Sequence, residues 1–547
     1  MARGMSGNLW EGRRRVSKKK DQPWNKKGIE GTWDAIVIGS GMGGMTTAAM
    51  LAKMGKRVLV IEQHYVPGGF THMFKRPGYI WDVGVHAVGE VTEKSMTGRL
   101  LSYLTNGKLK WASLGKNYDE FYFPDDFRID FPDSPQAFRD NLIEAFPDEV
   151  EAIDGYLSLI KQVAGGMKSY YLSRALPRLV SPLAERFMAK QAQEHLEWNT
   201  KEVVEKLTDN PKLQAVFTAQ WGYYGSVPSR SSFAIQALVV KHFIYGAFYP
   251  EGGAKEIALH LLQTVADAGG WTRISTSVEE IMIEKGRAVG VRLKGGDEIR
   301  AQTIVSAAGV AATARRLLPA QYRDARWVKG VEDLSQANAH ICLYIGFKGD
   351  IRKAGAGSAN KWFYDTWSCE VDVWDVHIEQ EELGKAAILY CSFPSLKDPH
   401  HDAGPEERHT GEVVTFVPWE AFTRWRETPW KKRGEAYEDF KKRMEASLLE
   451  QFLCKMPELR PMVDYVELST PLSTDNFCRP IRGSIYGLEP TPQRFKNPDL
   501  RPQSPIPGLY FSGSEVATVG VIGAMMGGVL ATMAAEPIAT AKMIRSI

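Results

Sequence analysis

Cysteine is scarce in this chain of 547 residues, with five residues scattered between Cys342 and Cys478 and no C-x-x-C pair. The odd count and wide spacing exclude a disulfide framework and a paired-cysteine zinc site, so we expect free thiols in a reducing compartment. The first 31 residues also lack the apolar core, about 7–15 residues long, of a secretory signal. These absences predict a cytoplasmic protein.

Acidic residues are few at the start of the chain, although the net charge of the whole chain is only +3. Residues 1–31 hold nine lysines and arginines and three acids, a net charge of +6. Two interpretations stay open: a solvated flexible arm, or an arm attracted to anionic lipid headgroups at about 1 kcal/mol per basic residue. Nucleic acid is not expected as a partner, because no nucleic-acid-binding motif accompanies these residues.

Long hydrophobic runs are also rare. Apolar residues make up 44% and charged residues 24% of the chain, which is typical of a soluble protein with two or more domains. Residues 516–535 carry no charge and are long enough to span a bilayer, but their glycines and alanines make them only moderately apolar. We therefore predict a helix of a soluble domain there.

A glycine-rich turn stands between two apolar runs, residues 34–38 and 57–61, that predict buried parallel strands. Gly39 permits a tight turn, Gly41 leaves room for a pyrophosphate, and Gly44 lets the following helix approach the sheet. The N-terminus of that helix faces the phosphates. The second run ends at Glu62, an acid placed to accept hydrogen bonds from ribose hydroxyls. This pattern predicts dinucleotide binding but does not separate FAD from NAD.

Two later segments favour a flavin. Gly68 and Gly69 would let the backbone approach the pyrophosphate or the ring, although an ordinary Pro-Gly turn is the alternative. Near the other end of the chain, residues 508–515 predict a short strand that leads to Gly513 and an acid, Glu515. No second G-x-G-x-x-G occurs, so no dedicated nicotinamide domain is expected.

With these motifs the chain resembles the flavin amine-oxidase and phytoene-desaturase superfamily, and within it the all-trans-retinol saturase and carotenoid isomerase branch. The resemblance implies an α/β fold, with a Rossmann-like FAD-binding domain of the GR2 or amine-oxidase type and an inserted α+β substrate domain. It covers residues 33 to 535 in order, on these pieces: 39–55 with Glu62, 68–69, 81–86, 249–253, 395–399, 470–472, 483–487 and 508–528.

The expected domains are discontinuous. The FAD-binding domain comprises residues 32–95, 250–310 and 500–547, the substrate domain comprises 96–249 and 311–499, and residues 1–31 form the basic arm. Residues 96–249 are expected to be mostly helical. Apolar residues at three- and four-residue spacing predict helices over 256–268 and 435–455.

The resemblance implies that FAD is bound non-covalently. Glu62 would hold the adenosine ribose, the Val278 backbone the adenine, and Glu515 the ribityl chain. The family often carries Asp at the last position, but the longer acid can still reach a ribityl hydroxyl. Val521 and Ile522 would lie under the ring. The predicted cofactor-binding residues are Gly39, Ser40, Gly41, Met42, Gly43, Gly44, Glu62, Gln63, Gly68, Gly69, Phe70, Thr71, Val278, Gly513, Glu515, Val521 and Ile522.

The leading hypothesis is an FAD-dependent oxidoreductase that acts on C=C bonds of a long apolar lipid: a retinoid, a carotenoid or an unsaturated fatty acyl chain. Saturation needs a proton donor, and the candidates are His86 and Tyr486, each of which also has a purely structural interpretation. Electrons would come from NAD(P)H docking transiently or from a protein donor. No metal site is expected, and the histidines at 400, 401 and 409 suit a solvated loop.

Other interpretations remain open. The same flavin and pocket would serve a redox-neutral cis-trans isomerase of a polyene. A binding module of the GDP-dissociation-inhibitor type shares the superfold without redox chemistry. Residues 167–198 mix basic and apolar residues, which suits either a helix lying on a membrane face or a surface helix with a buried stripe. The aromatic residues at 242–249 would line a tunnel or fill a core. The sequence predicts no oligomeric state.

Overall fold

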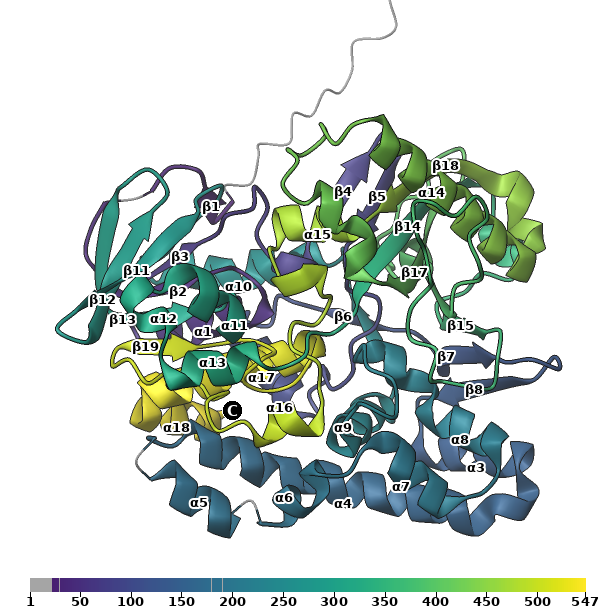
Figure 1. The fold of residues 1–547 in the computed structure, drawn as a ribbon, viewed down its shortest axis with the longest axis horizontal. Helices are drawn as coiled ribbons and strands as arrows, with labels where there is room; N and C mark the ends of the chain where they lie inside the picture. Colours follow the sequence, from purple (N-terminus) through teal and green to yellow (C-terminus); the bar gives the residue numbers. More distant parts are fainter. Residues whose placement is uncertain (1–21, 29, 179, 189) are drawn as a thin grey trace, which may run out of the picture.

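The computed structural model of this protein describes residues 22–28, 30–178, 180–188 and 190–547, and its elements form two β-sheets above a layer of helices (Figure 1). The first sheet lies on the left of the view, the second on the right, and the helices along the lower edge. Most of the predicted basic arm, residues 1–21, falls outside the described residues. Trp24–Asn25 forms strand β1, which pairs with β10 (Trp271–Arg273), so the expectation of a flexible arm is wrong at these two residues.

The first sheet is the Rossmann-like sheet. Its order is β1-β10-β3-β2-β13-β12-β11, with β19 also paired to β13. The strands are β2 (Trp33–Ile38), β3 (Val58–Ile61), β11 (Val278–Glu284), β12 (Arg287–Leu293), β13 (Glu298–Ser306) and β19 (Leu509–Phe511). All neighbours pair in parallel except β11, β12 and β13, which pair antiparallel to one another.

Helices bury both faces of this sheet, which explains the nearly unbroken apolar runs of β2 and β3. One face packs against α1 (Met42–Lys53), α10 (Lys255–Asp267) and α17 (Gly520–Ala535). The other packs against α11 (Val310–Ala312) and α13 (Arg326–Glu332). The helix predicted over 256–268 is confirmed within one residue at each end, whereas the uncharged stretch 516–535 becomes helical only from Gly520.

Helices α1 and α17 approach so closely that glycine is required at the contact. A Cβ added to Gly528 would lie 2.5 Å from Gly43 O, and one added to Gly43 would lie 3.0 Å from Ala524 O. Beside them, Thr47 Oγ1 lies 3.0 Å from Ser512 Oγ, and it donates to Gly528 O at 3.2 Å. Segments more than 460 residues apart in sequence therefore form one unit.

The second sheet has the order β18-β14-β17-β16-β15-β7-β8. The strands are β7 (Asn117–Tyr122), β8 (Arg128–Pro132), β14 (Ala339–Lys348), β15 (Asn360–Tyr364), β16 (Ile388–Ser392), β17 (Arg408–Val417) and β18 (Val463–Ser469). One face is covered by α14 (Glu435–Lys455), whose bounds match the predicted helix.

The hairpin of β4 (Met73–Arg76) and β5 (Tyr79–Asp82) lies against this second sheet, and Trp81 Nε1 donates to Ile345 O at 3.1 Å. Its residues fall within the segment 32–95 that was expected to build the FAD-binding domain. The buried ring contacts of Tyr79, Trp81 and Tyr344 explain the difference, because they join this hairpin to β14.

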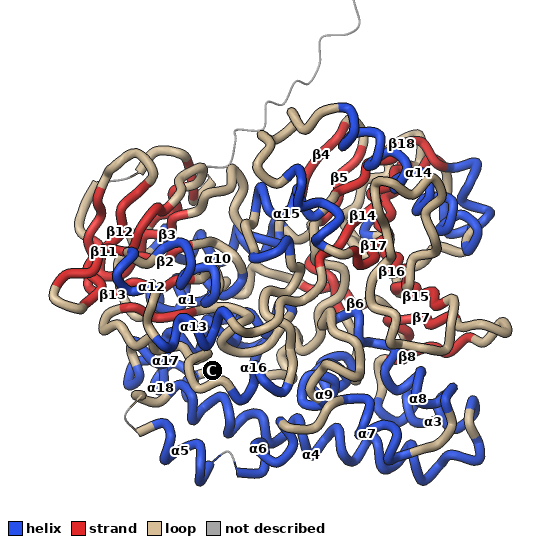
Figure 2. Tube along the Cα trace, in the orientation of Figure 1, coloured by secondary structure: helices blue, strands red, loops and turns tan. Residues whose placement is uncertain are grey.

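Segment 96–249 supplies most of the helical layer, drawn in blue along the lower edge of Figure 2. It is not wholly helical, because it also contributes β6 (Trp111–Ser113), β7, β8 and part of β9 (Phe248–Pro250). Its helices are α2 (Met96–Leu104), α3 (Pro135–Ala145), α4 (Val150–Ala175), α5 (Ser181–Met188), α6 (Lys190–Leu196), α7 (Thr200–Leu207), α8 (Pro211–Thr218) and α9 (Phe233–Phe243).

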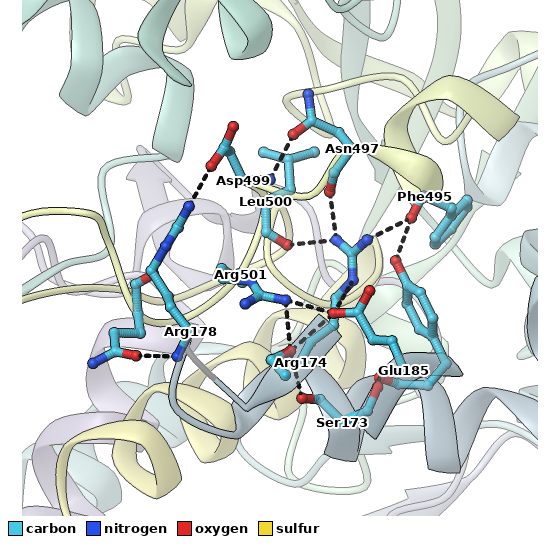
Figure 3. Close-up of polar contacts among 12 residues, drawn as sticks. Ser173, Arg174, Arg178, Glu185, Phe495, Asn497, Asp499, Leu500 and Arg501 are labelled. Atoms are coloured by element: carbon cyan, nitrogen blue, oxygen red, sulfur yellow. Dashed lines mark hydrogen bonds and ion pairs between the residues drawn. The ribbon is translucent and has the colours of Figure 1, made fainter. Parts of the chain in front are cut away.

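Arginine side chains tie this layer to the segment before β19 (Figure 3). At the end of α4, Arg174 donates to the carbonyls of Phe495, Asn497 and Leu500 at 3.0, 2.6 and 3.1 Å. Arg501 reaches back to Ser181 Oγ at 2.7 Å. The prediction of a single basic-apolar helix over 167–198 is wrong, because the chain forms three separate helices there, α4, α5 and α6. Arg174 is only 3% exposed, since its guanidinium donates to buried backbone carbonyls.

We expect Arg174→Met to lower the free energy of unfolding by about 3 kcal/mol, because it leaves buried carbonyls without donors. Urea denaturation of the FAD-loaded protein measures the change. Lys161→Met, at an exposed position of the same helix, is the control and should stay within about 0.5 kcal/mol of the parent. Equal stabilities of the two variants would show that the arginine cluster does not hold the layers together.

Candidate active site

A cavity of about 1240 Å³ lies between the two sheets, bounded by the glycine-rich turn, the first turn of α17 and strands of the second sheet. Fifteen of the predicted cofactor residues line it, as do both proton-donor candidates. Those fifteen are Gly39, Gly41, Met42, Gly43, Glu62, Gln63, Gly68, Gly69, Phe70, Thr71, Val278, Gly513, Glu515, Val521 and Ile522. Ser40 and Gly44 lie behind the lining.

The glycine-rich turn leaves room for a pyrophosphate. A Cβ added to Gly41 would meet no atom within 4 Å, so the space beside it is free, whereas one at Gly44 would lie 2.1 Å from Gly39 O. No side chain caps α1, so its first N–H groups stay available to phosphate oxygens. Gly68 and Gly69, at φ 120° and 58°, bring the next segment so close that a Cβ added to Gly69 would lie 3.0 Å from Gly41 Cα. These residues fit a dinucleotide.

Glu62 is held in place where the adenosine ribose was predicted. Its Oε2 accepts from Ser40 N at 2.8 Å and from Ser40 Oγ at 2.7 Å, and its Oε1 accepts from His64 N at 2.7 Å. Ser40 therefore orients the acid from behind. Lone pairs remain on the carboxylate for a ribose hydroxyl, as two oxygens offer about four acceptor sites.

The predicted cofactor-binding residues that line the cavity form what we call the flavin cradle. Glu515 lies at the end of this cradle opposite Glu62, where the start of α11 and the tight turn at Gly487 meet. Its Oε2 accepts from Val310 N at 2.5 Å and from Ala311 N at 3.2 Å. A Cβ on Gly487 would come within 2.6 Å of its Oε1, so the glycine makes room for the acid. Burial raises the pKa of Glu515, while the guanidinium of Arg494 opposes the rise.

The two proton-donor candidates differ in their surroundings. Tyr486 lies against Gly222 O at 3.4 Å, and burial raises the pKa of its hydroxyl. His86 Nδ1 lies 2.9 Å from Glu412 Oε2, and burial lowers the pKa of His86 to about 3. At neutral pH the imidazole is therefore neutral, and it can pass on a proton only if another group replaces it.

Three family motifs that are far apart in sequence meet behind His86. Lys397 Nζ donates to His86 O at 2.7 Å, Gly252 N donates to Asp398 Oδ1 at 2.9 Å, and Ala254 N donates to Asp82 Oδ1 at 3.0 Å. The floor of the chamber, the surface behind His86, is thus built by three segments: 81–86, 249–253 and 395–399. The sequence alone did not predict that these three segments contact one another.

Sequence reasoning missed several residues of this site. Glu412 and His340 interrupt the apolar runs of β17 and β14, and a polar residue inside a buried strand was the available signal. His340, Tyr390 and Tyr223 line the cavity. Nothing in the sequence places those side chains together, because they come from three separate segments.

Much of the remaining lining is apolar and includes Ile235, Leu238, Val239, Phe243, Trp362, Ile388, Val414 and Phe416, while Glu90, Lys168 and Lys241 add charged groups to it. The aromatic residues of 242–249 were predicted either to line a tunnel or to fill a core, and the structure shows some in each role. His242 and Phe243 line the cavity, Tyr249 is buried and donates to Asp82, and Tyr245 is 71% exposed. The cavity thus joins a polar cradle to an apolar chamber.

Known structures share this fold. A putrescine oxidase double mutant aligns with a TM-score of 0.60 at 17% identity, over 93% of this chain and 99% of that one. Cyclohexylamine oxidase from Brevibacterium oxydans gives 0.57 at 16% identity, over 94% and 100%. The sheet and these neighbours confirm the predicted fold class, an α/β fold with a Rossmann-like FAD-binding domain.

The family model for flavin containing amine oxidoreductase matches residues 42–535, and the chain belongs to this family. All-trans-retinol 13,14-reductase of Homo sapiens is 33% identical over 548 residues, covering 96% of this chain and 88% of that protein. The Danio rerio protein of that name is 32% identical over 511 residues, covering 90% and 84%. Chloroplastic prolycopene isomerase of Arabidopsis thaliana is 26% identical over 522 residues, covering 93% and 83%.

The protein is thus an FAD-dependent oxidoreductase, and the predicted family, cofactor and enzyme class are confirmed. The alternative prediction, a binding module of the GDP-dissociation-inhibitor type without redox chemistry, is therefore wrong. No helix within the described ranges is both long enough and apolar enough to cross a membrane.

We expect Gly41→Val to abolish FAD binding while the fold persists, because its Cβ has no protein atom within 4 Å and the side chain fills the space meant for the pyrophosphate. Flavin absorbance per mole of purified protein should fall by at least about tenfold, because FAD no longer co-purifies with the variant. Gly330→Val, also in open space, is the matched control. Retention of stoichiometric FAD by the Gly41 variant would contradict the assignment of the cradle.

Proposed function

We propose that this enzyme adds two hydrogens across a C=C bond of a long apolar polyene of the retinoid type. The observation that carries the proposal is the apolar chamber that continues directly from the flavin cradle. The retinol 13,14-reductases, related to this chain over more than four fifths of its length, support this choice of substrate.

The cradle residues hold FAD, which when reduced supplies the hydride of such an addition. The chain itself contributes binding and polarity. Apolar walls that include Trp362, Phe416 and Val414 exclude water and receive the polyene. Among the protic groups that line the chamber, His86 and Tyr486 are the proton-donor candidates. Gly520, Val521 and Ile522, the first residues of α17, aim the positive end of that helix into the cavity.

The direct test is the mass of the product. Purified, chemically reduced enzyme incubated with all-trans-retinol without oxygen should yield a product heavier by two hydrogens, because a hydride and a proton are both added. Mass spectrometry of the extracted lipid measures this gain. A loss of two hydrogens would instead identify a desaturase.

Redox-neutral cis-trans isomerisation is the second candidate, favoured by the relationship to prolycopene isomerase. It would give a product of unchanged mass and altered chromatographic retention in the same assay.

The reductant is proposed to be NAD(P)H docking transiently or a protein donor, because no second dinucleotide-binding motif was found in the sequence.

We further propose that the protein binds peripherally to the cytoplasmic face of a membrane. Leu183 and Phe187 of α5 are 61% and 74% exposed, and Arg186 and Lys190 are exposed beside them. Leu172 of α4 is both exposed and part of the cavity lining. Apolar and basic residues together suit an anionic lipid surface, from which a polyene could enter.

We expect Phe187→Glu with Leu183→Glu to weaken binding to anionic vesicles at least about tenfold, because each buried apolar side chain contributes roughly 1.5–3 kcal/mol. Vesicle co-sedimentation measures it. Val371→Glu, at a 51% exposed residue outside the helical layer, is the control. Unchanged sedimentation of the double variant would exclude α5 as the contact.

A further inference from the structure

Behind His86 lies a buried cluster of ionisable groups. Its carboxyl groups are Asp82, Asp119 and Glu412, which are 0, 0 and 1% exposed, and its cation is Lys397, at 4%. Charge is expensive to bury, so three carboxylates beside one ammonium would leave an uncompensated excess of negative charge. At least one of the three acids therefore holds a proton.

Hydrogen bonds identify which groups are charged. Lys397 Nζ has three acceptors, His86 O, Asn360 Oδ1 and Ser392 Oγ, one for each proton of an ammonium. Asp119 accepts from the hydroxyl of Tyr223 at 2.7 Å and from Asn360 Nδ2 at 2.9 Å, as an ionised carboxylate does.

Asp82 also accepts from two donors, the hydroxyl of Tyr249 and the backbone N–H of Ala254. Glu412 differs, since neither of its oxygens has a hydrogen-bond partner within the described part of the chain. Its nearest polar contact is His86 Nδ1, 2.9 Å from Oε2. Among the three acids, only Glu412 has no described donor in hydrogen-bond geometry, while the Lys397 ammonium and the backbone N–H of Asp82 still favour its charged form.

His86 connects this acid to the substrate chamber. The ring lines the cavity and turns Nδ1 toward Glu412, so Nε2 is the nitrogen that a bound polyene can reach. Edge-on contact with Tyr390, at 5.2 Å between centroids, and the grip of Lys397 on the His86 carbonyl fix the ring.

We propose that Glu412 stores the proton that His86 delivers to the substrate. This inference rests on the proposed function and names the acid it requires. As Nε2–H breaks, a C–H bond forms on the alkene carbon next to the one that receives the hydride of the reduced flavin. As Glu412 O–H breaks, Nδ1–H forms, so the imidazole changes tautomer and stays neutral.

The cluster stabilises the negative charge that remains on Glu412 after its proton has moved to His86. Glu412 becomes a carboxylate within electrostatic reach of the Lys397 ammonium. Water that enters after the product leaves returns one proton through His86. Burial raises the pKa of Glu412 well above its usual range, in keeping with this assignment. Burial also lowers the pKa of Lys397 to about 7, and the negative charge of the neighbouring carboxyl groups opposes that fall.

Infrared difference spectroscopy of the full-length, FAD-loaded protein tests the stored proton without any turnover. The spectrum of wild type minus Glu412→Gln at neutral pH should show the C=O stretch of a protonated acid, shifted in D₂O. His86→Gln should retain that band, since burial alone keeps Glu412 protonated. Absence of the band overturns the inference, whatever the enzyme does with retinol.

Turnover tests the delivery. The single-turnover rate of pre-reduced enzyme should fall about 10²- to 10⁴-fold in Glu412→Gln and in His86→Gln, with FAD content unchanged. Glu467→Gln, in the same sheet but paired with Arg76 near the surface, is the matched control. A wild-type rate in Glu412→Gln overturns the relay and points to Tyr486.

The pH–rate profile separates proton delivery from a structural role. A donor acts only while protonated, so the rate should fall as pH rises through the pKa of Glu412, and Glu412→Gln should lose that limb. The ionisable groups that face Glu412 are His86, Asp82, Lys397, Cys342, Tyr344 and Tyr390. A wild-type product without mass gain would refute the proposed function, while the infrared band would still report on Glu412.

Discussion

The close approach of α1 and α17 is the constraint on which the rest of this structure depends. Gly43 and Gly528 let the two helix backbones touch where a side chain would collide, and Gly527 does the same against the backbone at Gly513. This contact sets the first turn of α17 opposite the glycine-rich turn. Both ends of the cradle are fixed by it. The cavity exists because helices from opposite ends of the sequence share one van der Waals surface.

The chamber combines two environments that are usually kept apart. Its walls are apolar enough for a polyene, yet its floor gathers three acids, a lysine and a histidine in the same low-dielectric interior. Such a floor is stable only if each charge has a partner, and the hydrogen bonds to Lys397, Asp119 and Asp82 supply them. The acid left without donors is the one that faces the chamber through a histidine.

Local patterns predicted much of this protein. The glycine spacing at residues 39–44, the acid Glu62 and the heptad-like spacing of α14 depend on neighbours in sequence, so their readings needed no tertiary information. Contacts between remote segments were beyond such reasoning. Glu412 and His86 are 326 residues apart, and the carbonyls near residue 495 that accept from Arg174 are equally remote from α4. The β4–β5 hairpin joins the second sheet for a similar reason, a set of aromatic contacts with β14. The end of α4, in contrast, has a local cause, because Pro177 follows its last turn.

The distance in sequence between the two halves of the flavin cradle has a consequence for biosynthesis. The glycine-rich turn of a nascent chain leaves the ribosome long before residues 513–522, the segment that closes the cradle. The prosthetic group therefore cannot be enclosed until this later segment has emerged. Until then, the early βαβ unit exposes the apolar face of α1 that packs against α17 in the folded protein.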